Sequence, residues 1–142
     1  MSRIHIASDH AGFALKEHIA SSLRERGFEI VDHGTDSTDS CDYPVFAHAL
    51  CAAVEQDGTQ GILVCGSGIG MSMAANRHGG IRAALCTTEL HARLSRRHNN
   101  ANVLCLGARL TGVELADAIV QAFLAQDFEG GRHQRRIELL NF

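Results

Sequence analysis

The run Gly61-Ile62-Leu63-Val64-Cys65-Gly66-Ser67-Gly68-Ile69-Gly70 carries the strongest structural signal in the chain. Its first half is a short apolar segment of the kind that forms a buried strand, and its second half has glycine at every other position. Alternate glycines allow a tight backbone turn, and the residues after the turn, 71–76, have the pattern of a helix. A strand that passes through such a turn into a helix is the repeating unit of α/β proteins.

The same alternation continues in both directions along the chain. Short apolar runs predict five strands, and helix-length segments separate them. We therefore expect an α/β fold with a parallel sheet, helices on both faces and a ligand site beyond the carboxyl ends of the strands. The predicted strands are residues 3–7, 28–32, 61–65, 81–86 and 103–106, and two helices show apolar stripes, Leu15, Ile19, Leu23 and Val113, Ala116, Val120, Phe123.

Length and composition favour one domain over residues 1–142, because 142 residues with 45% apolar content can build a single core. The net charge of -3 gives no reason to expect a nucleic-acid or membrane partner. No apolar run approaches the ~18 residues that span a bilayer, and the N-terminus lacks a signal-peptide pattern. We expect a soluble, cytoplasmic protein.

Cysteine and histidine spacing argues against disulfides and metals. Five cysteines without a C-x-x-C pair predict free thiols, and nine scattered histidines show no H-E-x-x-H motif or zinc-type cluster. The sequence therefore predicts neither a metal nor another cofactor.

Cys65 stands at the first position of the glycine-rich loop. Backbone N–H groups of this loop and of the following helix could hold an anion or a developing oxyanion, and could stabilise a thiolate. The plain alternative is a buried, inert cysteine, which we expect of Cys51, Cys86 and Cys105. A dinucleotide fingerprint would need glycine at Met71, and no Gly-Lys-Ser/Thr follows, so nucleotide binding is disfavoured.

Two further segments place chemistry near strand edges. Asp9 and His10 follow the first strand, although Asp9 or Ser8 could simply cap a helix. His98 and Asn99 belong to a polar run that could be only a solvated helix exit, but a histidine can also move protons at neutral pH. The longest loop, 34–42, belongs at the ligand edge and precedes a helix that starts near Tyr43 or Pro44.

The tail, residues 128–142, lies past the last predicted helix. If it is helical, Arg132 and Arg136 share one face and could grip a phosphate, with Arg109 as a third cation, although all three could be ordinary surface charge. Such a tail could reach into a neighbouring subunit.

Together these motifs resemble the ribose-5-phosphate isomerase B and galactose-6-phosphate isomerase family over essentially the whole chain. The resemblance implies a three-layer α/β/α sandwich around a five-stranded parallel, Rossmann-like sheet with a C-terminal tail helix. It also implies a cofactor-free homodimer with active sites between the subunits, and leaves open whether dimers pair into tetramers. The motifs are S-D-H-A-G (8–12), D-Y-P (42–44), C-G-S-G-I-G (65–70), A-A-N (74–76), G-I-R-A (80–83), H-N-N-A-N (98–102) and E-G-G-R-H (129–133).

The resemblance also assigns roles. Cys65 would be the base that moves a proton between C1 and C2 of a sugar phosphate through a cis-enediolate, and His98 would assist ring opening. Asp9 and His10 would place the sugar hydroxyls. The other implied site residues are Ser67, Gly66, Gly68, Ile69 and Gly70 around the enediolate oxygen, Tyr43 and Asn99 in the pocket wall, and Arg109, Arg132 and Arg136 at the phosphate.

Alternatives remain open at this point. One branch of the family uses a glutamate at the position of Met71, and the presence of Cys65 favours the cysteine branch. We expect conversion of ribose 5-phosphate to ribulose 5-phosphate, but erythrulose 4-phosphate, allose 6-phosphate or galactose 6-phosphate would use the same chemistry. A non-catalytic sugar-phosphate sensor or a flavodoxin-like domain is disfavoured by the joint presence of Cys65 and His98 and by the missing cofactor motifs.

Overall fold

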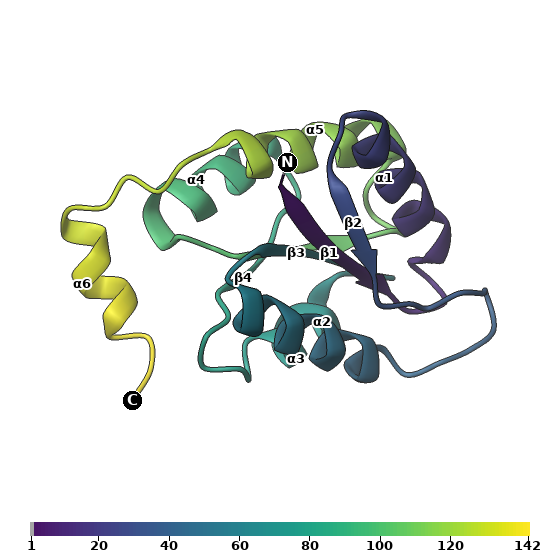
Figure 1. The fold of residues 1–142 in the computed structure, drawn as a ribbon, viewed down its shortest axis with the longest axis horizontal. Helices are drawn as coiled ribbons and strands as arrows, with labels where there is room; N and C mark the ends of the chain where they lie inside the picture. Colours follow the sequence, from purple (N-terminus) through teal and green to yellow (C-terminus); the bar gives the residue numbers. More distant parts are fainter. Residues whose placement is uncertain (1) are drawn as a thin grey trace.

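The computed structural model describes residues 2–142 as strands and helices in alternation, as the sequence predicts (Figure 1). Each strand is followed by a helix that carries the chain back across the sheet, so all strands run in the same direction. The elements are β1 (Arg3–Ser8), α1 (Phe13–Glu25), β2 (Glu29–Asp32), α2 (Tyr43–Asp57), β3 (Gln60–Cys65), α3 (Ile69–Ala75), β4 (Ala83–Leu85), α4 (Glu89–Asn99), β5 (Val103–Gly107), α5 (Val113–Ala125) and α6 (Arg132–Glu138).

The five strands form one parallel sheet in the order β2-β1-β3-β5-β4. Ser8 pairs with Val64 and Cys65 with Gly107, so the strands β1, β3 and β5 end at the same level. The helix after β1 covers one face of the sheet and the helix after β3 covers the other. Because the chain leaves β1 and β3 toward opposite faces of the sheet, a crevice opens beyond the carboxyl ends of these two neighbouring strands. Ligands of such folds bind in this crevice.

Two hydrophobic cores make the structure a three-layer sandwich (Figure 1). On one face the sheet packs against α1, α4 and α5, with Phe123 fully buried, and on the other against α2 and α3, with Leu50 and Met71 fully buried. Residues alternate between the two cores along each strand, because successive side chains of a strand point to opposite faces. Cys65 belongs to the α2–α3 side.

The largest differences from the predicted elements concern β4, the start of α3 and the apolar stripe of α5. β4 covers only Ala83–Leu85, because Ile81 belongs to a turn that bonds its N–H to His78 and Arg82 donates its N–H to the Asn102 side chain. α3 begins at Ile69, two residues earlier than expected. The predicted apolar stripe of α5 holds except at Val113, which is 52% exposed in the first turn.

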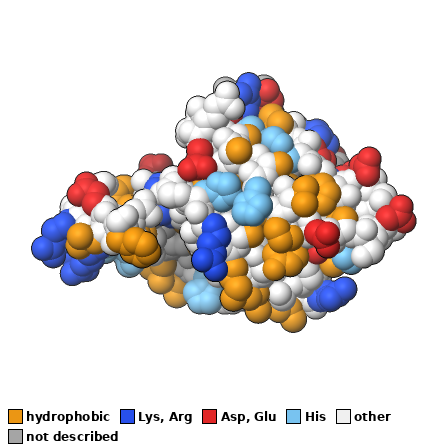
Figure 2. Space-filling model, turned by 90° about the horizontal axis from the view of Figure 1, so that it is seen from below, with side chains coloured by type: hydrophobic (Ala, Val, Ile, Leu, Met, Phe, Trp, Pro, Cys, Tyr) orange, Lys and Arg blue, Asp and Glu red, His pale blue; other side chains and the backbone are white. Residues whose placement is uncertain are grey.

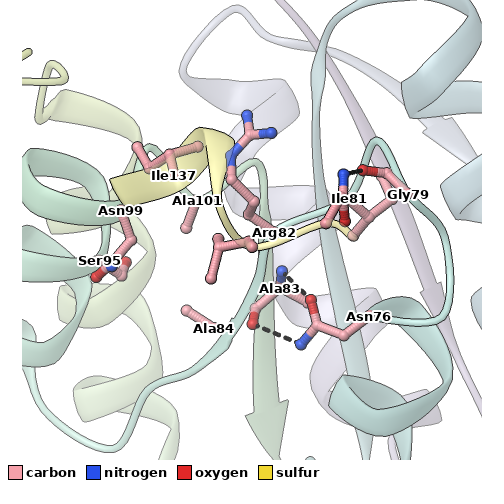
Figure 3. A pocket seen from close by; sticks show the side chains of 12 residues that line it. Asn76, Gly79, Ile81, Arg82, Ala83, Ala84, Ser95, Asn99, Ala101 and Ile137 are labelled. Atoms are coloured by element: carbon pink, nitrogen blue, oxygen red, sulfur yellow. Dashed lines mark hydrogen bonds between the residues drawn. The ribbon is translucent and has the colours of Figure 1, made fainter. Parts of the chain in front are cut away.

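The tail helix α6 stands apart from the sheet at the end of the molecule opposite to the strand arrowheads (Figure 1). It contacts α4, and Asn141 donates a hydrogen bond to the Gly79 carbonyl oxygen (2.7 Å), so the tail crosses the edge of β4. A cavity of about 390 Å³ lies between α6 and this edge (Figure 3). Asn76 covers the free edge of β4 by exchanging two hydrogen bonds with the Ala83 backbone. Within residues 2–142, no helix combines the length and hydropathy that crossing a bilayer requires.

Candidate active site

A pocket of about 310 Å³ opens at the carboxyl ends of β1 and β3, where the topology predicts a ligand site. Most of the residues that line it come from the segments after β1, β3 and β5, and one comes from the start of α2. They are Asp9, Tyr43, Cys65, Gly66, Ser67, Gly70, Arg109 and Leu110.

Cys65 is the last residue of β3, and its side chain is the only thiol that lines this pocket. Its Sγ accepts a hydrogen bond from the backbone N–H of Gly68 (3.2 Å). Gly68 has φ 79°, a left-handed conformation that favours glycine, and a Cβ there would lie 2.9 Å from the Leu106 carbonyl carbon. The loop can therefore wrap around the sulfur only with glycine at this position, and its N–H is aimed at the negative charge of a thiolate.

Three other cysteines lie outside this pocket. All five are free thiols, but burial, helped by the nearby Glu55 carboxylate, raises the pKa of Cys51 to about 12. Burial likewise raises the pKa of Cys86 to about 11 and that of Cys105 well above its ordinary value. These three thiols stay protonated at neutral pH and point into the cores, so they offer no base to the pocket.

Ser67 completes the loop beside the sulfur. Its Oγ accepts a hydrogen bond from the N–H of Ile69 (3.2 Å), which leaves the hydroxyl hydrogen able to donate to a ligand. The loop thus presents a thiol and a hydroxyl at one pocket wall.

Asp9 and His10 lie beside this wall, each tied to backbone. Asp9 Oδ1 accepts a hydrogen bond from Gly12 N–H (3.0 Å), so the carboxylate does brace the turn before α1 while it lines the pocket. His10 Nδ1 accepts from the N–H of Cys41 (3.3 Å), which places the ring proton on Nε2 and ties loop 34–42 to the site.

Two glycines of the loop make room for larger side chains. A Cβ on Gly70 would lie 2.6 Å from Cζ of Tyr43, so the Tyr43 ring rests directly on the start of α3. A Cβ on Gly66 would lie 3.1 Å from a guanidinium nitrogen of Arg109, so this cation covers the loop from the other side. The pocket is therefore bounded by an aromatic ring and a positive charge, a combination suited to a sugar that carries a phosphate.

The structure does not bring the remaining predicted site residues to Cys65 within one chain. α4 runs back from the carboxyl edge of the sheet, so His98 and Asn99 at its end lie at the amino edge, about 15–20 Å away along strands of five or six residues. Asn99 lines the cavity beneath α6. Arg132 and Arg136 are exposed on α6, and within residues 2–142 neither forms an ion pair.

Two features near the predicted residues were missed by sequence reasoning. Leu110 lines the pocket while 69% exposed, and no periodicity or motif marks it. His133 is buried against His98, and together with Glu129 these form the one cluster within residues 2–142 whose potential metal-ligating atoms all lie within 4.8 Å. Glu129 and His133 both belong to the E-G-G-R-H motif, so the sequence contained a signal for this cluster. The motif predicted a role only for Arg132.

Comparison with known proteins decides the family. A sequence profile of the ribose/galactose isomerases matches residues 4–140.

The chain belongs to the ribose/galactose isomerase family.

Its relatives in this family are similar over nearly their full length. The chain is 49% identical to ribose-5-phosphate isomerase B of Escherichia coli, over 99% of this chain and 95% of the relative. A ribose-5-phosphate isomerase B structure from Thermotoga maritima is 52% identical with a TM-score of 0.96, covering 97% of this chain and 96% of that one. Another, from Mycoplasma genitalium with bound ribulose 5-phosphate, is 45% identical with a TM-score of 0.94, covering 97% and 93%.

Family membership confirms the predicted α/β fold and establishes the protein as an aldose–ketose isomerase of sugar phosphates. The pocket at Cys65 fits this class of reaction, because it combines a potential base, hydrogen-bond donors and a cation.

Proposed function

We propose that this isomerase interconverts ribose 5-phosphate and ribulose 5-phosphate through a cis-enediolate, with Cys65 as the base. The observation that carries the proposal is the Cys65 sulfur at the pocket wall, 3.2 Å from the backbone N–H of Gly68. The relatives named for this activity, among them the structure with bound ribulose 5-phosphate, support the choice of a five-carbon sugar.

The reaction needs one carbon-bound proton to move and one oxygen charge to be held. The Cys65 thiolate takes the proton from C2 of the open-chain aldose, and the electron pair of the broken C–H bond forms the C1–C2 double bond while negative charge develops on O1. Ser67 and the loop N–H groups are the nearest donors for that charge. Return of the proton from Sγ to C1, with transfer of the O2 proton to O1, yields the ketose and regenerates the thiolate.

Asp9 and Arg109 complete the part of the site that one chain supplies. Asp9 is fixed by its hydrogen bond to Gly12, so its carboxylate offers the sugar hydroxyls an acceptor at a set position. The Arg109 guanidinium, lying over Gly66, is placed to attract the phosphate end of the substrate.

We further propose that the complete site is shared between two copies of the chain. The tail helix α6 and the end of α4 lie at one end of the molecule (Figure 1), and they carry the tail arginines and the ring-opening histidine. Cys65 ends β3, at the opposite edge of the sheet. The face between them, formed by α2 and α3, gathers exposed hydrophobic side chains (Figure 2). Two copies packed antiparallel across this face would bring each tail to the other's pocket, as a two-fold symmetric dimer requires. The large exposed apolar residues of α2 and α3 are Tyr43, Val45, Ile69 and Met73.

Turnover on a substrate panel tests the reaction. We expect metal-free turnover that is fastest on ribose 5-phosphate, compared with allose 6-phosphate, galactose 6-phosphate and erythrulose 4-phosphate. The Cys65→Ala variant should lose turnover on every sugar, whereas Cys51→Ala, which removes a buried thiol outside the pocket, should retain it. A preference for another sugar would replace the proposed substrate, and full activity of Cys65→Ala would overturn the proposed base.

Complementation tests the shared site. Cys65→Ala homodimers are expected to be inactive and His98→Ala homodimers to keep only a small, measurable residual activity. Half of the dimers in an equal, exchanged mixture are mixed, and each mixed dimer regains one intact site. Activity should therefore return to about one quarter of the wild-type value if the site combines two chains. No recovery after verified subunit exchange would contradict the shared site.

A further inference from the structure

Three side chains between α4 and the tail form a unit that the proposed reaction does not yet explain. The imidazole rings of His98 and His133 stack with centroids 4.5 Å apart and planes 17° from parallel. His133 is only 7% exposed, and its buried Nε2 has no hydrogen-bond partner, although the Glu129 carboxylate lies 3.5 Å away. A polar atom left unpaired in this way costs free energy, so the unit lowers the stability of the fold.

Glu129 fixes this unit to the end of α4. Its backbone N–H donates to the Arg97 carbonyl oxygen (3.0 Å), and its side chain pairs with the Arg97 guanidinium (3.3 Å). Desolvation acts to raise the pKa of Glu129, but the charges of Arg97, His133 and His98 outweigh it and lower that pKa below the ordinary value. The carboxylate therefore stays charged and ties the start of the tail to the helix turn that carries His98.

We propose that Glu129 and His133 are positioning residues that hold the imidazole of His98 in the orientation needed for opening the sugar ring. This inference rests on the proposed function, in which His98 acts on the substrate. A partly exposed histidine in the last turn of a helix samples several ring orientations. A flat ring stacked against it removes most of them, and orientation of a catalytic group is worth orders of magnitude in rate.

The geometry favours this role over a metal site at the same three residues. The lone pair of an imidazole nitrogen lies in the plane of its ring, so two nearly parallel rings cannot both aim at one ion. The Arg97 guanidinium on the Glu129 carboxylate also places a positive charge where a cation would bind.

A double-mutant cycle tests whether His133 acts through His98. We expect His133→Ala to lower kcat about 10-fold with little change in KM, because a misplaced proton-transfer group loses part of its contribution. In a His98→Ala background the same change should have no further effect. His133→Phe, which restores a flat ring, should recover most of the loss. The control is His18→Ala, which removes a histidine that pairs with Asp117 between α1 and α5 and is not part of this unit.

Ring-proton NMR of His98 provides a readout that does not depend on turnover. The stacked ring should shift the His98 ring protons upfield, and this shift should vanish in His133→Ala and shrink in Glu129→Gln, while His18→Ala leaves it unchanged. Equal losses from His133→Ala with and without His98, or a His98 spectrum that ignores both variants, would overturn the proposal. So would a shift that appears only with added Zn²⁺ and disappears with a chelator. An inactive wild-type protein with the expected spectra would instead count against the proposed function alone.

Discussion

Replacing Gly70 by alanine should separate stability from activity. Gly70 lies in the first turn of α3, and its φ is not in the left-handed region, so the backbone accepts alanine without strain. Alanine is favoured over glycine inside a helix by about 1 kcal/mol, which stabilises the folded protein. The new methyl group, however, would lie 2.6 Å from Cζ and 3.0 Å from Oη of Tyr43.

The ring of Tyr43 must therefore move. Carbon atoms in contact prefer separations of about 3.5–4.0 Å, so the ring has to shift by about 1 Å, and it can do so cheaply because Tyr43 is 38% exposed at the pocket rim. A displacement of this size in a substrate-positioning residue can reduce the rate about 100-fold. We expect Gly70→Ala to lower kcat/KM on ribose 5-phosphate by about 10- to 100-fold, with an unchanged or higher Tm.

Thermal melts and steady-state kinetics of the same preparations provide the assay. Gly112→Ala is the matched control, because a Cβ there meets no atom within 4 Å. Unchanged kcat/KM in Gly70→Ala would refute the reasoning, since it would show that the position of the Tyr43 ring does not matter to the reaction.

Three further predictions concern stability. Lys16→Met should reduce the free energy of unfolding by about 2–3 kcal/mol in urea denaturation. Nζ of the buried Lys16 donates hydrogen bonds to both Asp32 carboxylate oxygens and to the Thr35 carbonyl oxygen, and the substitution leaves these acceptors unpaired. Gly68→Ala should cost about 2–4 kcal/mol by the same assay, from positive φ and contact with Leu106, and an unaltered midpoint would contradict the left-handed turn. Stability should also fall on acidification. Burial and the neighbouring His5 lower the pKa of His33, so the unfolded chain takes up that proton first below about pH 6.5. Desolvation acts to raise the pKa of Asp57, but hydrogen bonds from Thr59 and His5 outweigh it and lower that pKa. The stability that this carboxylate contributes is therefore lost below about pH 4. Asp57→Asn should flatten the lower part of that profile in denaturation series from pH 7.5 down to about pH 2.

The sequence predicted the fold and every residue that lines the pocket except Leu110, in part from local patterns and in part through the family resemblance. The strand, glycine loop and helix around Cys65 follow one another in the chain, and parallel topology then places Asp9 and Arg109 at the same edge. Leu110 could not be predicted, since an exposed leucine carries no pattern that distinguishes a pocket wall from an ordinary surface.

The positions of His98 and His133 show a different limit. His98 was expected near a strand edge, but a helix that returns across the sheet ends at the amino edge, away from Cys65. Its contact with His133 joins α4 to α6, which lie on either side of β5, α5 and an irregular segment in the chain. No hydrophobic period describes the path of that segment. In the proposed dimer, His98 of one chain meets Cys65 of the other through contacts on the α2–α3 face. Sequence periodicity identifies that face only as exposed and does not show what it contacts.

Exchange of solvent deuterium tests the role of Cys65 most directly. Ribose 5-phosphate incubated with the wild-type protein in D₂O, and analysed by NMR of the product and the recovered aldose, should gain deuterium at C1 of the ketose and at C2 of the aldose. Cys65→Ala should bind the sugar phosphate but catalyse no exchange. Deuterium incorporation at the wild-type rate in Cys65→Ala would contradict the account, because the carbon-bound proton would then be moved by another group.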